Sequence, residues 1–177
     1  MQCPGSIVLK IFDAIRILRD KGIVVIGGLH SPMERECLDL LLRGSQPVIL
    51  CSAKGLNRLK LGKSARTALK ENRLLVLSPF DPTIRRTTAA RAIFRNNLVA
   101  AMSVAMLIPH ATASGRIWQT VRQSIETGHP VFTFDDEANT NLKDMGAKAD
   151  RIDIVCNLIF SVFDWIKKPH KDHAQIK

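Results

Sequence analysis

The stretch that decides the fold is Gly22-Ile23-Val24-Val25-Ile26-Gly27-Gly28-Leu29-His30-Ser31-Pro32-Met33-Glu34, which predicts a strand, a glycine turn and a helix start. Four consecutive β-branched residues, Ile23 to Ile26, are typical of a strand buried on both faces. Gly27 and Gly28 let the chain turn sharply or let a ligand approach the backbone. Ser31, Pro32 and Glu34 fit the N-cap, the first helical position and the acid of a capping box. The helix N-terminus would favour an anion, but a well-capped turn without a ligand explains the same residues.

Outward from this stretch, apolar runs alternate with helical periodicity along the whole chain. We expect strands at 23–26, 48–51, 74–77, 104–108 and 130–134, and helices at 6–21, 32–43, 63–71, 89–102, 115–127, 138–145 and 151–168. This order predicts a Rossmann-like three-layer α/β fold, with a mostly parallel sheet and helices on both faces. One domain over residues 1–168 and a mobile tail over 169–177 are expected. The chain opens on a helix, so either the sheet tolerates this or a first strand is missing.

Charge and composition limit the classes of partner. The 177 residues carry a net charge of +10, and residues 54–95 hold eleven Lys/Arg against only Glu71 and Asp81. Such a segment favours a polyanion, although a solvated basic face without a ligand has the same composition. No apolar run approaches the roughly 18 residues of a membrane span and no export signal is evident, so a cytoplasmic protein with no membrane partner is expected. Four scattered cysteines predict reduced thiols, no metal site and no cofactor.

The candidate site lies where predicted strands end, because ligands of such sheets bind at the carboxyl ends of the strands. Three groups fall there, and together they would form a composite anion site: Gly27, Gly28, His30 and Ser31; Arg85 and Arg86, followed by Arg95 and Asn96; and His110, Ser114, Gly115 and Arg116. Arg91 and Arg95 share a helix face and would repel one another without an anion between them. Aromatic residues are only 5% of the chain, which argues against an extended base-stacking platform and favours contacts to phosphates.

The middle of the chain resembles a known family. Phe94-Arg95-Asn96-Asn97-Leu98-Val99-Ala100-Ala101-Met102-Ser103, then Ser114-Gly115, then Glu126-Thr127-Gly128-His129-Pro130-Val131-Phe132 look like the Rossmann-like domain of the bacterial DNA-processing protein A (DprA/Smf) family. The resemblance covers roughly residues 5–135 and points to a compact, single-domain branch. The family's first strand lies upstream of the Cys-Pro-Gly position at residues 3–5, so that strand is expected to be missing. Asn97 stands where the family has a second arginine.

The resemblance implies binding of single-stranded DNA, a role in DNA processing, recombination or transformation, and a recombinase partner, without a known enzymatic reaction. It assigns Gly27, Gly28 and Ser31 to a phosphate-binding turn, Arg95-Asn96 to the family's Arg-Asn pair, and Ser114-Gly115 to its Ser-Gly turn. Two alternatives stay open: a non-catalytic nucleotide-sensing or partner-binding module, and a nucleotide phosphoribohydrolase. The hydrolases carry a Pro-Gly-Gly-x-Gly-Thr-x-x-Glu turn, but residues 112–119 lack its second glycine and its glutamate. A sheet edge exposed by a missing strand would favour a homodimer.

Overall fold

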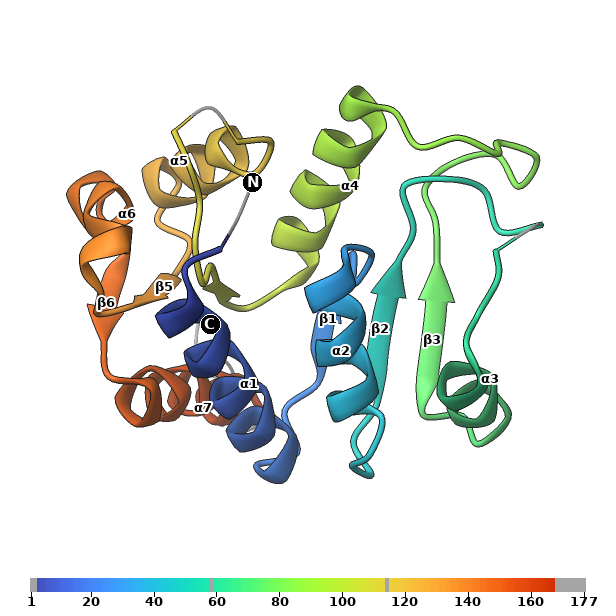
Figure 1. Cartoon of the computed structure of the whole chain (residues 1–177), viewed down its shortest axis with the longest axis horizontal. Coiled ribbons are helices and arrows are strands. Elements are labelled where there is room, and N and C mark those ends of the chain that lie inside the picture. Colours follow the sequence, from blue (N-terminus) through green and yellow to red (C-terminus); the bar gives the residue numbers. More distant parts are fainter. Residues whose placement is uncertain (1–2, 58, 114, 168–177) are drawn as a thin grey trace, which may run out of the picture.

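The computed structural model describes residues 3–57, 59–113 and 115–167, with side chains described up to residue 159. Helices surround two groups of strands that lie next to each other (Figure 1). The order is α1 Gly5–Asp20, β1 Val25–Gly27, α2 Pro32–Leu41, β2 Val48–Cys51, α3 Lys63–Lys70, β3 Leu74–Leu77, α4 Ala89–Met102, β4 Met106–Leu107, α5 Trp118–Glu126, β5 Val131–Phe134, the 3-10 turn η1 Glu137–Asn139, α6 Thr140–Met145, β6 Lys148–Asp150 and α7 Ile152–Lys167. The expected tail over 169–177 lies outside the described residues, as does Ser114.

The strands form two parallel sheets of three strands each, in the orders β1-β2-β3 and β4-β5-β6. In the first sheet, Val25 lies opposite Val48 and Val48 opposite Leu74. In the second, Phe132 lies opposite both Leu107 and Lys148. The α/β class with parallel strands is therefore confirmed. The single continuous sheet is not, because no strand of the described chain joins β1 to β4.

One hydrophobic core nevertheless runs under both sheets. Ile7 of α1, Leu41 of α2 and Val48 of β2 are fully buried in the same cluster as Phe132 and Phe134 of β5. Helix α1 packs against α2 on one side and α7 on the other. A smaller cluster around Val121 and Leu142 joins α5 and α6 to the second sheet, and Trp118 packs against it. The halves are thus held together by α1, α7 and shared apolar contacts.

The deciding stretch forms a shorter and more exposed strand than its sequence predicts. Strand β1 begins at Val25, all three of its residues are partly exposed, and Val24 is 36% exposed. The N–H of Ile23 donates to the carbonyl of Leu18 at 3.0 Å, so the first residue of the apolar run is still part of the exit from α1. Strand β1 is therefore less buried than its sequence predicts, and among the described strands it pairs with β2 alone.

The second half departs further from the expected elements. Strand β4 is only two residues long, and α5 begins at Trp118, not at 115. Strand β6, Lys-Ala-Asp, was not predicted because it lacks the apolar or β-branched residues of a strand, and its pairing with β5 defines it. The helix expected at 138–145 divides into η1 and α6, with the Asp136 side chain accepting from the N–H of Ala138. No helix within the described ranges is long and apolar enough to cross a bilayer.

Candidate functional site

The turn after β1 has the predicted capping box. The Ser31 hydroxyl accepts from the N–H of Glu34 at 3.4 Å, and the Glu34 carboxylate accepts from the N–H groups of Ser31 at 2.8 Å and His30 at 3.1 Å. A carboxylate thus already lies at the N-terminus of α2, where an anion would bind. His30 itself is exposed. The backbone amides of this turn favour the well-capped alternative over a phosphate seat.

Gly28 leaves space for the side chain of an arginine from the same chain. A Cβ at this position would overlap the guanidinium of Arg95, whereas a Cβ on Gly27 would make only an ordinary 3.4 Å contact with Leu29. Arg95 reaches across the end of β1 and donates from Nη1 to the carbonyl of Cys51 at 3.0 Å, while its Nε donates to the side-chain oxygen of Asn96 at 3.0 Å. Burial lowers the pKa of Arg95, and the nearby Glu34 acts in the opposite direction. The close approach that the glycine permits is therefore already used within the chain.

Helix α4 directs its two arginines to different acceptors. Thr88 caps the helix by accepting from the N–H of Arg91 at 3.2 Å. The Arg91 side chain turns back and donates to the carbonyl of Arg86 at 3.0 Å, whereas Arg95 turns inward to Cys51. The repulsion expected between Arg91 and Arg95 is thus relieved without an anion.

The loops after β2 and β3 are joined into one platform at the carboxyl end of the first sheet. The N–H of Gly55 donates to the carbonyl of Ile84 at 2.8 Å, and that of Asn57 to the carbonyl of Pro82 at 3.2 Å. The Ser78 hydroxyl donates to the carbonyl of Lys54 at 2.9 Å. A Cβ on Gly55 would overlap two backbone carbonyl groups, so only glycine allows this approach. The sequence contains Gly55, but nothing in its neighbours reveals that two loops meet there.

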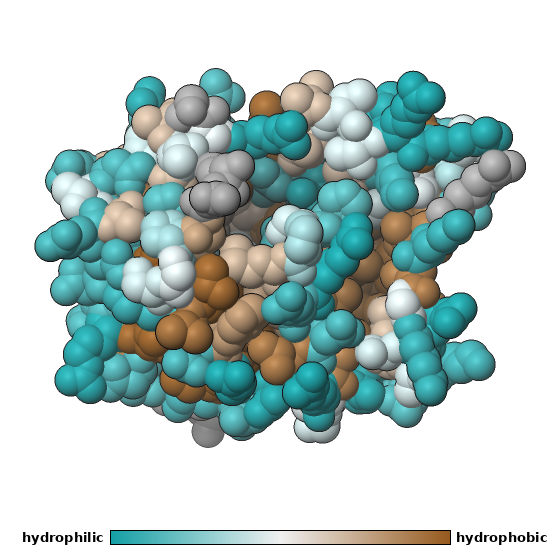
Figure 2. All heavy atoms as spheres, in the orientation of Figure 1, coloured by the Kyte–Doolittle hydropathy of each residue, from teal (hydrophilic) through white to brown (hydrophobic). Residues whose placement is uncertain are grey.

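This platform carries cations without acidic partners. We define the basic edge as Lys54, Arg85, Arg86 and Arg91. Arg85 and Arg86 are exposed, and among the described basic side chains of residues 54–95 only Arg73 is in an ion pair, with Glu71. The carboxyl ends of β2 and β3 and their loops lie at the upper right of Figure 1, and strongly hydrophilic side chains gather at the same corner in Figure 2. The sequence-predicted Arg85 and Arg86 are therefore brought together with Lys54 and Arg91.

The rest of the basic segment lies elsewhere. Lys63, Arg66 and Lys70 belong to α3, which sits at the opposite end of β3 from this platform (Figure 1). The dense run of positive charge in the sequence therefore divides into two separate surfaces.

The turn after β4 is held against the second sheet, not against the basic edge. A ring nitrogen of His110 lies 3.1 Å from the side-chain oxygen of Asn139, a fully buried residue whose amide donates to the carbonyls of Pro109 and Phe134. The N–H of Gly115 donates to the carbonyl of Thr112 at 2.8 Å, and Arg116 is exposed. The expected cap by Ser114 lies outside the described residues, and helix α5 starts three residues beyond Gly115.

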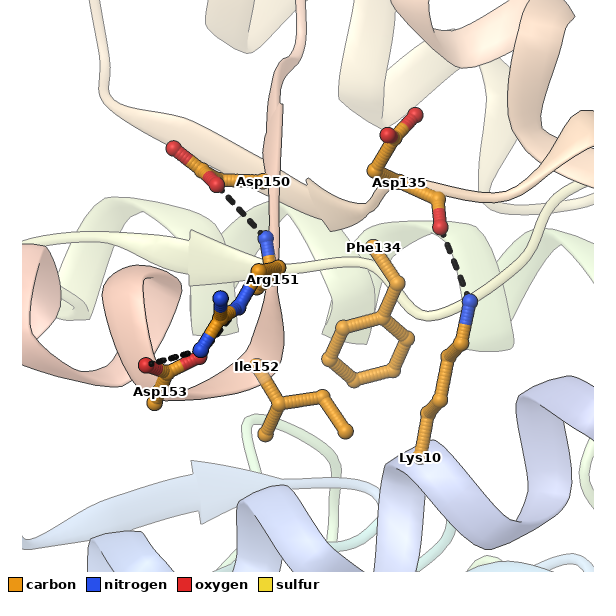
Figure 3. A pocket seen from close by; sticks show the side chains of 7 residues that line it. All are labelled: Lys10, Phe134, Asp135, Asp150, Arg151, Ile152 and Asp153. Atoms are coloured by element: carbon orange, nitrogen blue, oxygen red, sulfur yellow. Dashed lines mark hydrogen bonds and ion pairs between the residues drawn. The ribbon is translucent and has the colours of Figure 1, made fainter.

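A hollow lies at the carboxyl ends of β5 and β6, and sequence reasoning missed it because β6 was not recognised. It has a volume of about 280 Å³, with Phe134 and Ile152 as its apolar wall (Figure 3). Its charged groups are engaged: Lys10 donates to the carbonyl of Asp135 at 2.8 Å, and Arg151 pairs with Asp153 at 3.1 Å. Its five charged residues are Lys10, Asp135, Asp150, Arg151 and Asp153, with acids in the majority, so a polyanion does not suit it. No metal-binding group of three or more ligands occurs within the described ranges.

The parallel strands and the helices that connect them define a Rossmann-like α/β protein. More narrowly, the chain belongs to the DNA recombination-mediator protein A family, whose sequence profile matches residues 9–162. The family expected from the sequence is thereby confirmed.

Two solved structures show the same fold. One is the DNA processing protein A of Helicobacter pylori, described for its single-stranded DNA binding mode, with a TM-score of 0.71 and 19% identity over 90% of this chain and 76% of that one. The other is the DprA of Streptococcus pneumoniae, with a TM-score of 0.68 and 18% identity over 84% of this chain. This chain spans only 55% of the Streptococcus protein. No curated protein sequence matches it significantly.

Proposed function

We propose that this chain binds the phosphate backbone of single-stranded DNA along the basic edge, as part of DNA processing or recombination. The observation that carries the proposal is the set of unpaired cations on a platform that hydrogen bonds hold together. Exposed Arg and Lys without acidic neighbours gain most from neutralising phosphates, because the released counterions supply the free energy. The family membership and the single-stranded DNA bound by the Helicobacter relative support the same ligand.

Arg95 has a different role in this proposal from the one the sequence suggested. Its guanidinium donates to Cys51 and Asn96 beneath the platform, so it positions the end of β2. The direct phosphate contacts fall to the basic edge, where Arg85 and Arg86 are exposed to solvent. Gly27, Gly28, Ser31 and Asn96 support the shape of this end of the sheet.

The test is a salt titration of binding to a fluorescent oligo(dT), followed by anisotropy. Four phosphate contacts predict that log K falls with log[salt] with a slope of about −3, since each contact to a single strand contributes about 0.7. Arg86→Ala should lower the slope by about 0.7, and its backbone carbonyl stays available to Arg91. The matched control is Lys63→Ala, which removes an exposed charge of the same segment from α3 and should leave the slope unchanged.

The same titration separates the alternative functions. A mononucleotide that raises the melting temperature by mass action, with no effect of oligo(dT), would support a nucleotide sensor instead. Release of free base from a nucleoside monophosphate would support the hydrolase. Absence of salt-dependent oligonucleotide binding would refute the proposal.

We further propose a homodimer, a recombinase partner and a cytoplasmic location. The unpaired sides of β3 and β6, at the two ends of the row of strands in Figure 1, offer strand edges to a second copy. Sedimentation at micromolar concentration tests the dimer, and a monodisperse monomer would contradict it. Co-elution with a purified recombinase on a single-stranded DNA column, beyond the amount that DNA alone retains, tests the protein partner.

A further inference from the structure

We propose that Phe94 forms a base-stacking subsite next to the basic edge, so that one base of the bound single strand lies on its ring. This inference rests on the proposed function and adds a contact to the base, where the basic edge contacts phosphates. Phe94 is 57% exposed, which is unusual for a large aromatic side chain. It lies in the first half of α4, three residues after Arg91, so the two side chains are neighbours on the helix surface.

Phe94 is held in place by a second aromatic ring. Its ring centroid lies 5.7 Å from that of Phe80, and the ring planes are inclined at 56°. Phe80 belongs to the loop after β3, and the N–H of Phe80 donates to the Ser78 hydroxyl at 3.2 Å. Ser78 also fixes the carbonyl of Lys54, so the same serine links the aromatic pair to the basic edge. The Phe94 ring is thus held on one side by Phe80, while more than half of its surface faces solvent.

The chemistry of the surroundings identifies the occupant. An exposed ring beside unpaired cations suits a ligand that carries a flat apolar group and a negative charge on each repeating unit, as single-stranded DNA does. The Arg91 side chain donates to the carbonyl of Arg86, which brings the helix bearing Phe94 to the loop that carries Arg85 and Arg86. A base on Phe94 would therefore place its flanking phosphates near the basic edge. The scarcity of aromatic residues in the chain is consistent with one stacking position and not with an extended platform.

The experiment compares oligo(dT) with an oligonucleotide of equal length whose residues are all abasic, so that phosphates are kept and bases removed. Phe94→Ala should weaken oligo(dT) binding about five- to hundred-fold and leave binding of the abasic strand within twofold. Phe94→Leu should behave like Phe94→Ala, because leucine can pack against Phe80 but offers no aromatic face. Phe94→Trp should retain or strengthen binding.

The matched control is Met102→Ala, which truncates another exposed apolar side chain of the same helix and should not alter affinity for either strand. Melting temperatures of the Ala and Leu variants of Phe94 equal to that of the unmodified chain would show that a loss of folding does not cause the change in binding. If Phe94→Ala binds oligo(dT) within twofold of the unmodified chain while Arg86→Ala still lowers the salt slope, stacking is refuted and the proposed function stands. If the unmodified chain binds neither strand, the proposed function fails as well.

Discussion

The contact between Gly28 and Arg95 gives the sharpest prediction of the fold around the first turn. Gly28→Ala places a methyl group where the guanidinium of Arg95 now lies. Arginine is flexible, so the side chain will swing away and the backbone will stay in place. The main effect of the substitution is therefore the loss of one hydrogen bond, from Nη1 of Arg95 to the carbonyl of Cys51.

The magnitude follows from that bond. A hydrogen bond from a charged group contributes about 1.5–3 kcal/mol, and Cys51 is fully buried, so its carbonyl loses a partner that solvent replaces poorly. Replacing glycine by alanine also stabilises the folded chain by about 0.4–1 kcal/mol, because alanine lowers the conformational entropy of the unfolded chain. We expect the free energy of unfolding to fall by about 1–2 kcal/mol in Gly28→Ala, and the melting temperature by about 2–4 °C for each kcal/mol in a chain of this length.

The assay is urea unfolding followed by far-UV circular dichroism for four proteins: the unmodified chain, Gly28→Ala, Arg95→Ala and the double variant. In the Arg95→Ala background the new methyl group meets no guanidinium, so the second change should cost nothing or should stabilise the chain slightly. Gly27→Ala is the control, because its methyl group would make only an ordinary contact with Leu29, and it should stay within about 0.5 kcal/mol. The same cost for Gly28→Ala with and without Arg95 would refute the reasoning, since the penalty would then come from another source.

Three further changes test other parts of the structure. Gly55→Ala should separate the two loops of the platform, because its Cβ would overlap the backbone carbonyls of Asp81 and Pro82 and no side chain can move aside; faster cleavage within residues 52–62 by a protease is the expected result, and unchanged cleavage would contradict it. Asn139→Ala should lower the free energy of unfolding by about 2–4 kcal/mol in urea, since it leaves the carbonyls of Pro109 and Phe134 without their donor; a loss below about 0.5 kcal/mol would show that water replaces the amide. Burial raises the pKa of Cys37 and of Cys156 to about 11, whereas the thiols of the unfolded chain have a pKa of about 8.5. Between these two pH values the folded chain binds more protons than the unfolded chain. The contribution of the two thiols to stability is therefore fully present below about pH 8.5 and is lost as the pH rises to about 11. The urea midpoint of Cys37→Ala should fall less between pH 8 and pH 10.5 than that of the unmodified chain, and an equal fall would contradict the assignment.

Features with local causes were predictable from the sequence. The capping box of Ser31 and Glu34 and the cap of Thr88 depend on residues within one helical turn, and both are present. Strands β2 and β3 are continuous apolar runs whose bounds match the prediction. β2 lies between β1 and β3, and β3 pairs with β2 along its whole length. The buried positions of Cys37 and Cys51 follow from the same patterns.

Features that depend on distant partners were not predictable. Strand β6 exists because Lys148 to Asp150 lie along β5, and the three residues have no strand character of their own. Gly27-Gly28 was compatible with a close ligand or with a plain turn, and the arginine that fills the space beside Gly28 comes from a position 67 residues along the chain. The even spread of positive charge over residues 54–95 suggested one surface, and only the direction of α3 shows that there are two.

The division of the strands into two sheets has a consequence for how the molecule opens. The N–H groups of Met106 and Ile108 donate to the carbonyls of Pro130 and Phe132, so the amide of Leu107 between them faces away from β5. Amides of this kind, along the unpaired sides by which β1 and β4 face each other (Figure 1), should exchange with solvent deuterium through small local fluctuations. Those of β2 and β5 lie inside their sheets, and Val48 and Phe132 share one apolar cluster. We expect their exchange to require global unfolding and to show the same denaturant dependence. The shared apolar core makes the two halves unfold together, although no strand-to-strand hydrogen bonds join the two described sheets.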